Sequence, residues 1–149
     1  MYKIAFLISI LLLGCTEKKM GTRPQDRLSE YISLSFNVKD DSGFRDLLGY
    51  LTGDAKARLG SWSEDQFYEV FVNSKRKFER LILKSVKKIS ETEVNITYEL
   101  HFSEMRKGKT VNIKNRKLCR MVFENKKWLI KEVMNIKELV EFENSLTVP

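Results

Sequence analysis

The spacing of apolar positions predicts a helical first part and a strand-forming second part of the chain. After Pro24, which fits the first turn of a helix because its missing N–H has no intrahelical partner there, apolar residues recur at the spacing of one helix face. With one polar exception, they are Leu28, Tyr31, Ile32, Ser35 and Phe36. We therefore expect a helix that begins at Pro24 and ends before the polar segment 39–43.

Turn and capping residues divide the rest of the first part into further short helices. The segment 39–43, KDDSG, breaks the first helix and offers Asp41 or Ser42 as the cap of a second one. The apolar face of that helix is Phe44, Leu47, Leu48 and Leu51. Ser63 and Gln66 have the spacing of a capping box and precede the apolar residues Phe67, Val70 and Phe71. Three or four short helices are thus expected in this part.

Apolar positions after Lys77 alternate, as they do in strands with one buried face. The clearest set, in which a polar residue follows each member, is Val94, Ile96, Tyr98, Leu100 and Phe102. Gly108 in MRKGK and the segment ENKK at 124–127 mark tight turns. Four consecutive strands joined by short turns are expected, and they would pair as an antiparallel meander.

The strand expected over 110–123 contains a break in its apolar pattern. The apolar residues on either side of the break share one phase: Val111, Ile113, Cys119, Met121 and Phe123. The polar residues Asn115 and Lys117 intervene, and we expect a β-bulge at these two positions. Helices followed by an antiparallel sheet predict an α+β fold in which N-terminal helices pack on one face of a curved four-stranded sheet.

This order of elements resembles the NTF2-like superfamily, whose domains form a cystatin-like cone. Three features carry the resemblance: the helical stretch FRDLLGYLTGDAKARL at 44–59, the helix WSEDQFYEVF at 62–71, and a late strand that begins at Trp128 after a tight turn. The resemblance covers residues 24–142 and implies a helical layer on a curled sheet. It implies no particular activity, because the superfamily contains enzymes, pocket binders and scaffolds.

A different hydrophobic pattern lies at the start of the chain. The run Ile4–Leu13 follows Lys3 and is apolar on every helix face. It is too short to cross the hydrocarbon core of a bilayer, which takes about 20 residues, but it fits the apolar region of a signal peptide. The end of the run, LLGC at 12–15, resembles the lipobox of bacterial lipoproteins.

The lipobox resemblance implies cleavage between Gly14 and Cys15, lipidation of the Cys15 thiol and acylation of the new amino group. It divides the chain into a signal peptide, a lipidated tether and a single α+β domain, at 1–14, 15–23 and 24–149. The alternative is an initial helix that packs on the domain, with Cys15 as a buried thiol. Because Thr16 rather than Asp follows the cysteine, the resemblance favours the outer membrane, facing the periplasm, if the cell is Gram-negative.

Charge adds a candidate binding surface. The chain has 27 Lys and Arg against 20 Asp and Glu, a formal net charge of +7, and basic residues gather from Lys75 to Lys88 and from Arg106 to Arg120. The candidates for attraction to anionic lipid or envelope polymers are Lys84, Lys87, Lys88, Lys114 and Arg116. The alternative is a solvated sheet face whose lysines prevent edge-to-edge aggregation. Nucleic acid is not an expected partner of an exported, tethered domain.

The chain offers few residues for catalysis. His101 is its one histidine and lies in the polar phase of its strand, so we expect it on the outer side of the sheet. Asp40 with Asp41, and Glu64 with Asp65, fit helix starts, where carboxylates complement the helix dipole. The sequence contains no Gly-rich phosphate loop, metal-ligand spacing or nucleophile motif. We therefore expect no cofactor, no metal and no enzyme activity.

Cys119 has two interpretations. If Cys15 is lipidated, Cys119 has no disulfide partner within the chain. Its strand-like surroundings, KLCRMVF, favour a small buried thiol. Lys117 and Arg120 nearby would instead lower the pKa of a more exposed thiol and make it reactive.

Two hypotheses about function remain. The first is a membrane-tethered, non-catalytic binding or scaffolding module, with other envelope proteins among its partners. The second is a cone that binds a small ligand or acts as an enzyme, which requires an apolar cavity with convergent polar groups. Side chains of Glu99, His101 and Tyr68 that point into one such cavity would favour the second hypothesis.

Overall fold

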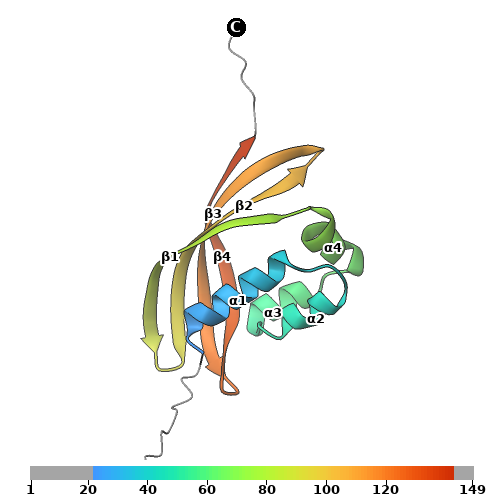
Figure 1. The fold of residues 1–149 in the computed structure, drawn as a ribbon. Coiled ribbons are helices and arrows are strands. Elements are labelled where there is room, and N and C mark those ends of the chain that lie inside the picture. Colours follow the sequence, from blue (N-terminus) through green and yellow to red (C-terminus); the bar gives the residue numbers. More distant parts are fainter. Residues whose placement is uncertain (1–21, 143–149) are drawn as a thin grey trace, which may run out of the picture.

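The computed structural model describes residues 22–142, which form four α-helices and one π-helical turn followed by a four-stranded sheet (Figure 1). The helices α1, α2, α3 and α4 cover Pro24–Phe36, Ser42–Leu48, Gly53–Gly60 and Glu64–Tyr68, and the π-helical turn η1 covers Glu69–Asn73. The strands β1, β2, β3 and β4 cover Lys77–Ser90, Glu93–Arg106, Lys109–Glu124 and Lys127–Phe142. The predicted α+β fold, with helices before strands, is confirmed.

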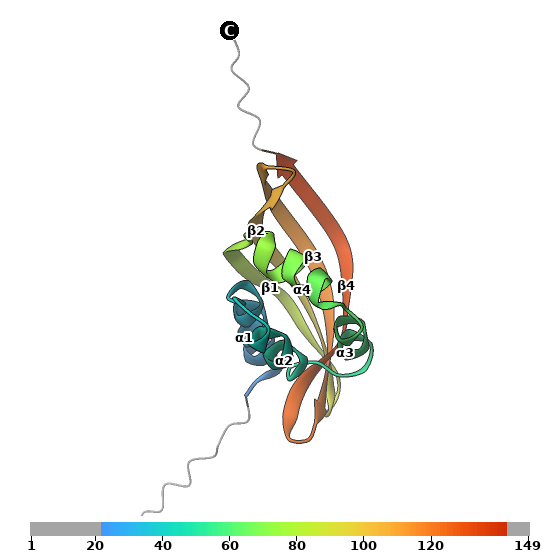
Figure 2. The same ribbon diagram turned by 90° about the vertical axis from the view of Figure 1, so that its right-hand side faces the viewer.

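The strands pair in sequence order as an antiparallel meander, β1-β2-β3-β4, as the turn residues predict. The long strands curve, and the helices lie on one face of the sheet, which we call the inner face (Figure 1). Figure 2 looks onto this helical layer, with α1, α2 and α4 in front of the strands. On β2 the predicted alternation holds, because Val94, Ile96, Tyr98, Leu100 and Phe102 are all buried.

The bulge expected within β3 is absent from the β2–β3 ladder of the described residues. This ladder runs without a register shift from Glu93↔Val122 to Arg106↔Lys109. Asn115 and Lys117 keep the phase of Ile113 and Cys119 and therefore lie on the inner face. A register shift occurs on the β4 side, where Arg116 pairs with Lys137 and Lys117 pairs with Asn135. The extra residue, Ile136, is thus on β4, and β3 instead places two polar side chains on its buried face.

The hydrophobic core lies between the helices and the inner face. Helix α1 contributes Leu28 and Ile32, and the polar exception in its stripe, Ser35, is also buried. The Ser35 hydroxyl donates to the Ile32 carbonyl at 2.7 Å, which satisfies its buried donor. The largest fully buried side chains are Leu28, Leu47, Ile96, Ile113, Met121 and Ile130. The core therefore draws on both layers.

Helix caps differ in how well the sequence predicts them. Ser63 and Gln66 form the expected capping box of α4. At α2, neither expected residue supplies a side-chain cap, because the carboxylate of Asp40 accepts from the N–H and hydroxyl of Ser42 instead.

The apolar positions expected at Phe67, Val70 and Phe71 are only partly confirmed, because Phe67 is buried but Val70 is 40% exposed. The chain changes to the π-helical turn η1 at Glu69, so residues three apart no longer share a face. Phe71 still stacks on Phe67, with ring centroids 4.9 Å apart.

The segment after α2 is bonded directly to the edge of the sheet. Leu51 forms a parallel bridge with Ile130 of β4. The Thr52 N–H donates to the Ile130 carbonyl, and the Ile130 N–H donates to the Tyr50 carbonyl, both at 2.9 Å. These bonds fix the helical layer to one edge of the sheet.

The expected signal peptide, with Gly14 and Cys15, and most of the tether lie outside the described residues. Within residues 22–142, no helix is long and apolar enough to span a membrane. The first described residues and the turn between β3 and β4 lie at the same end of the molecule, and the end of β4 lies at the other (Figure 1).

Candidate functional site

Two of the five candidate basic residues share one carboxylate on the outer face of the sheet. Arg116 donates two hydrogen bonds to Glu99 Oε1, and Lys84 Nζ lies 3.4 Å from Glu99 Oε2. The hydrogen bonds from Arg116 lower the pKa of Glu99 below its ordinary value. The positive charges of Arg116 and Lys84 are thus partly compensated within the sheet.

The other three candidates do not share one surface. Lys114 pairs with Glu141 of β4 at 3.3 Å, and Lys88 pairs with Glu91 in the turn after β1. Lys87 lies opposite Asn95 and Lys88 opposite Val94, so their side chains leave opposite faces of β1. The structure therefore places Lys84, Lys114 and Arg116 on the outer face, where Lys114 and Arg116 line one pocket with Glu99 and His101, and separates Lys88 from them.

The three residues that would favour an enzyme or ligand cone do not converge. His101 lies on the outer face, as expected, with Nε2 3.7 Å from Glu99 Oε2. Tyr68 belongs to α4 in the helical layer, where a hydrogen bond to Asp41 raises the pKa of its hydroxyl. Glu99 and His101 therefore lie across the sheet from Tyr68.

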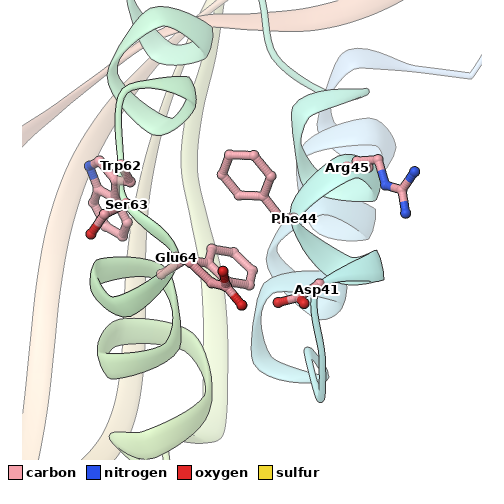
Figure 3. Close-up of a pocket in the computed structure, with 7 residues that line it drawn as sticks. Asp41, Phe44, Arg45, Trp62, Ser63 and Glu64 are labelled. Carbon is pink, nitrogen blue, oxygen red and sulfur yellow. The ribbon is translucent and has the colours of Figure 1, made fainter.

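A pocket of about 410 Å³ lies between α2 and α4 (Figure 3). Three aromatic residues line it: Phe44, Trp62 and Phe67. The rings of Phe44 and Phe67 meet edge to face with centroids 5.1 Å apart. The aromatic rings make the pocket suitable for an apolar group.

The mouth of this α2–α4 pocket is acidic. Asp41 and Glu64 come from opposite sides of the opening, and Arg45 points away from it (Figure 3). The Ser63 hydroxyl in the lining is already used by the capping box. The pocket can therefore hold an apolar group while its two carboxylates attract a positive charge.

A second group of polar residues lies on the inner face, and we call Arg76, Asn115 and Lys117 the inner polar cluster. The Arg76 guanidinium carbon lies 4.2 Å from the ring centroid of Phe36 and 5.1 Å from that of Phe102. Burial lowers the pKa of Arg76. Burial and the charge of Arg76 both lower the pKa of Lys117, so the two cations lie within electrostatic reach of each other.

Asn115 is the most buried member of the cluster, with 5% of its surface exposed. Its Oδ1 atom is buried and accepts no hydrogen bond from any described residue. The side chains of Arg76 and Lys117 likewise form no hydrogen bond or ion pair within residues 22–142. This cluster is not visible in the sequence, where Asn115 and Lys117 have the pattern of a bulge and Arg76 lies in a run of basic residues.

Cys119 is a buried core residue, as the first interpretation expects. Burial raises the pKa of its thiol to about 12, so Lys117 and Arg120 do not activate it. Tyr31, on α1, is partly buried against the core, and desolvation raises the pKa of its hydroxyl to about 12.

Among residues 22–142, no group of three or more His, Cys, Asp or Glu side chains is arranged to hold a metal ion. No protein-family model matches the chain, and no curated protein matches it. The α2–α4 pocket and the inner polar cluster are the features of the described residues that bear on function.

Proposed function

We propose that this protein is a membrane-anchored bacterial envelope lipoprotein whose folded domain is a non-catalytic binding or scaffolding module. The α2–α4 pocket carries the binding role, because it combines aromatic walls with an acidic mouth. The LLGC sequence at 12–15 supports the anchor. The order of helices before a curved meander supports the finer proposal of an NTF2-like fold.

The pocket favours a particular kind of partner. Its aromatic walls suit an apolar side chain, and the carboxylates of Asp41 and Glu64 suit a Lys or Arg beside it. We therefore expect the module to bind a segment of another envelope protein in which an apolar residue stands next to a basic one. The proposed location is the inner leaflet of the outer membrane, with the domain in the periplasm.

Site-specific crosslinking tests the binding role. A photo-crosslinking amino acid replaces Glu64 at the pocket mouth, and the matched control replaces Lys56, an exposed residue of α3. We expect a discrete adduct in cells from position 64 and not from position 56. Addition of Asp41→Lys should remove the adduct, because it places a cation where a cation should bind.

Two results would contradict the proposed binding role. One is equal crosslinking from positions 64 and 56. The other is an adduct from position 64 that persists with Asp41→Lys. In either case the α2–α4 pocket would not be the site where the partner is bound.

A further inference from the structure

The inner polar cluster holds more positive charge than its neighbours compensate. Glu104 acts electrostatically on Arg76, and Glu138 acts on Lys117. Both carboxylates instead contact Arg106, at 2.6 Å and 3.8 Å. Three cations therefore share two carboxylates, and the region keeps a net positive charge.

Aromatic contacts explain only part of the position of Arg76. The rings of Phe36 and Phe102 interact with the face of the guanidinium. Its N–H donors point outward in the plane of the group and need acceptors. Among the described residues no acceptor is bonded to them, although burial of an unpaired charge is unfavourable.

Lys117 and Asn115, on the inner face of β3, also carry polar groups without a hydrogen-bond partner among the described residues. The Lys117 ammonium group is half-buried without a bonded carboxylate in residues 22–142. Asn115, two residues away on the same face, has an amide oxygen that is buried and unpaired. A 180° rotation about the last side-chain bond exchanges the amide oxygen and nitrogen of Asn115. It would place an NH₂ donor at the position that Oδ1 now occupies. Arg76, Lys117 and Asn115, each with a polar group left unsatisfied within residues 22–142, thus share the inner face of the sheet.

We propose that Arg76, Lys117 and Asn115 form a binding site for an oxyanion, the phosphate or carboxylate group of a small molecule, on the inner face of the sheet. A guanidinium binds such a group through two parallel hydrogen bonds, and an ammonium adds a point charge. Arg76 and Lys117 are only half-buried, so a ligand can reach them. This inference requires neither the lipid anchor nor the α2–α4 pocket.

Titration calorimetry of the Cys15→Ala chain tests the proposal with three probes: inorganic phosphate, glycerol phosphate and hexanoate. Ionic strength is held constant with chloride. We expect saturable binding of at least one probe. Preference for phosphates or for hexanoate identifies the natural oxyanion, and either preference supports the site.

Matched variants locate the binding. Lys117→Met keeps the length of the side chain and removes its charge, and Lys114→Met does the same on the outer face of β3. We expect Lys117→Met to weaken binding at least tenfold and Lys114→Met to weaken it less than twofold. Thermal unfolding verifies that both variants fold. Lys117→Met should be at least as stable as the parent without ligand, because a half-buried cation without a bonded carboxylate is removed.

Two outcomes would overturn the proposal. One is the failure of all three probes to bind the parent chain saturably. The other is equal affinity for Lys117→Met and the parent. Neither result would affect the crosslinking test of the α2–α4 pocket, so the two proposals can fail separately.

Discussion

At the scale of single residues, the core treats its buried polar side chains in two ways. The Ser35 hydroxyl donates a hydrogen bond within its own helix, to the Ile32 carbonyl. The Asn115 amide oxygen accepts no hydrogen bond from any described residue, because the backbone N–H groups of the neighbouring strands are already used in the ladders. The buried serine in α1 is therefore a packing residue, whereas the buried asparagine belongs to the proposed oxyanion site.

Cys119 gives a prediction at this scale. Because burial raises the pKa of its thiol to about 12, very little thiolate exists near neutral pH. In the Cys15→Ala chain at pH 8, we expect iodoacetamide to alkylate native Cys119 at least about a thousandfold more slowly than the urea-unfolded chain. Mass spectrometry measures both rates. Similar rates in the two states would mean that the thiol is accessible and that the second interpretation of Cys119 is right.

At the scale of elements, the sequence predicts what depends on local spacing. Apolar positions that recur every 3.6 or every 2 residues can be recognised over a few residues. The sequence therefore predicts α1 and the alternation of β2. The capping box of α4 is equally local, because it joins residues three positions apart. These elements need no knowledge of their distant neighbours.

The features that the sequence does not predict depend on contacts between segments that are distant in the sequence. A polar residue on a buried face and a break in phase give the same local sequence pattern. The pattern at Asn115 and Lys117 therefore predicts a bulge although none interrupts the ladder with β2. Only the unbroken ladder with β2 distinguishes the two cases. Likewise, Arg76 resembled a surface cation because its contact with Phe36 joins segments that lie far apart in the sequence. The carboxylate partner of Arg116, Glu99, follows from the register of two strands rather than from either strand alone.

The capping box gives a prediction for α4. Ser63→Ala removes the side-chain acceptor for the Gln66 N–H and should lower the free energy of unfolding by about 1 kcal/mol. Urea denaturation measures this as a lower midpoint with an unchanged slope. The control is Ser61→Ala, which removes a hydroxyl bonded only to the Arg58 carbonyl at the end of α3. Equal effects of the two variants would show that the capping box adds nothing to α4.

At the scale of the whole molecule, the two ends of the sheet differ. Thr22, the first described residue, lines a pocket of about 250 Å³ with Arg27, Lys126, Lys127 and Trp128. We call these five residues the tether end. The proposed tether has a maximum reach of roughly 33 Å, so this end would face the bilayer. Lysines and a tryptophan suit the surface of an anionic membrane.

The tether end gives a prediction about membrane attraction. A chain that begins at Gly21 should bind vesicles of anionic lipid at low salt and leave them as salt rises, because screening weakens the attraction. Each well-placed lysine contributes about 1 kcal/mol, so Lys126→Gln with Lys127→Gln should weaken binding roughly 30-fold. Sedimentation with vesicles measures the bound fraction.

A matched pair of changes on the outer face provides the control. Lys114→Gln with Arg116→Gln should have a smaller effect, because both residues are already paired with carboxylates. If this pair weakens binding more than the pair at the tether end, the outer face of the sheet is the membrane surface. If neither pair nor salt changes binding, the basic residues serve solubility alone.

The anchor itself gives a prediction for the full chain. Each buried acyl carbon contributes about 0.8 kcal/mol, so two or three chains hold a protein firmly on a bilayer. Expressed in a Gram-negative bacterium, the parent should be processed at Cys15 and recovered with membranes. Cys15→Ala should leave an unprocessed or released protein. Identical membrane fractions, and masses that differ only by the substitution, would contradict the lipoprotein proposal.

The placement of the two ends also determines how the molecule would carry tension. The start of α1 and the end of β4 lie at opposite ends of the long axis (Figure 1). A pull between an anchor at one end and a load at the other acts along β4 and parallel to its ladder with β3, which extends from Glu124↔Lys127 to Val111↔Phe142. In this shear geometry many backbone hydrogen bonds must break together, whereas a pull across the strands would break them one after another. The β3–β4 ladder should therefore resist a pull along β4 more strongly than a pull across the strands.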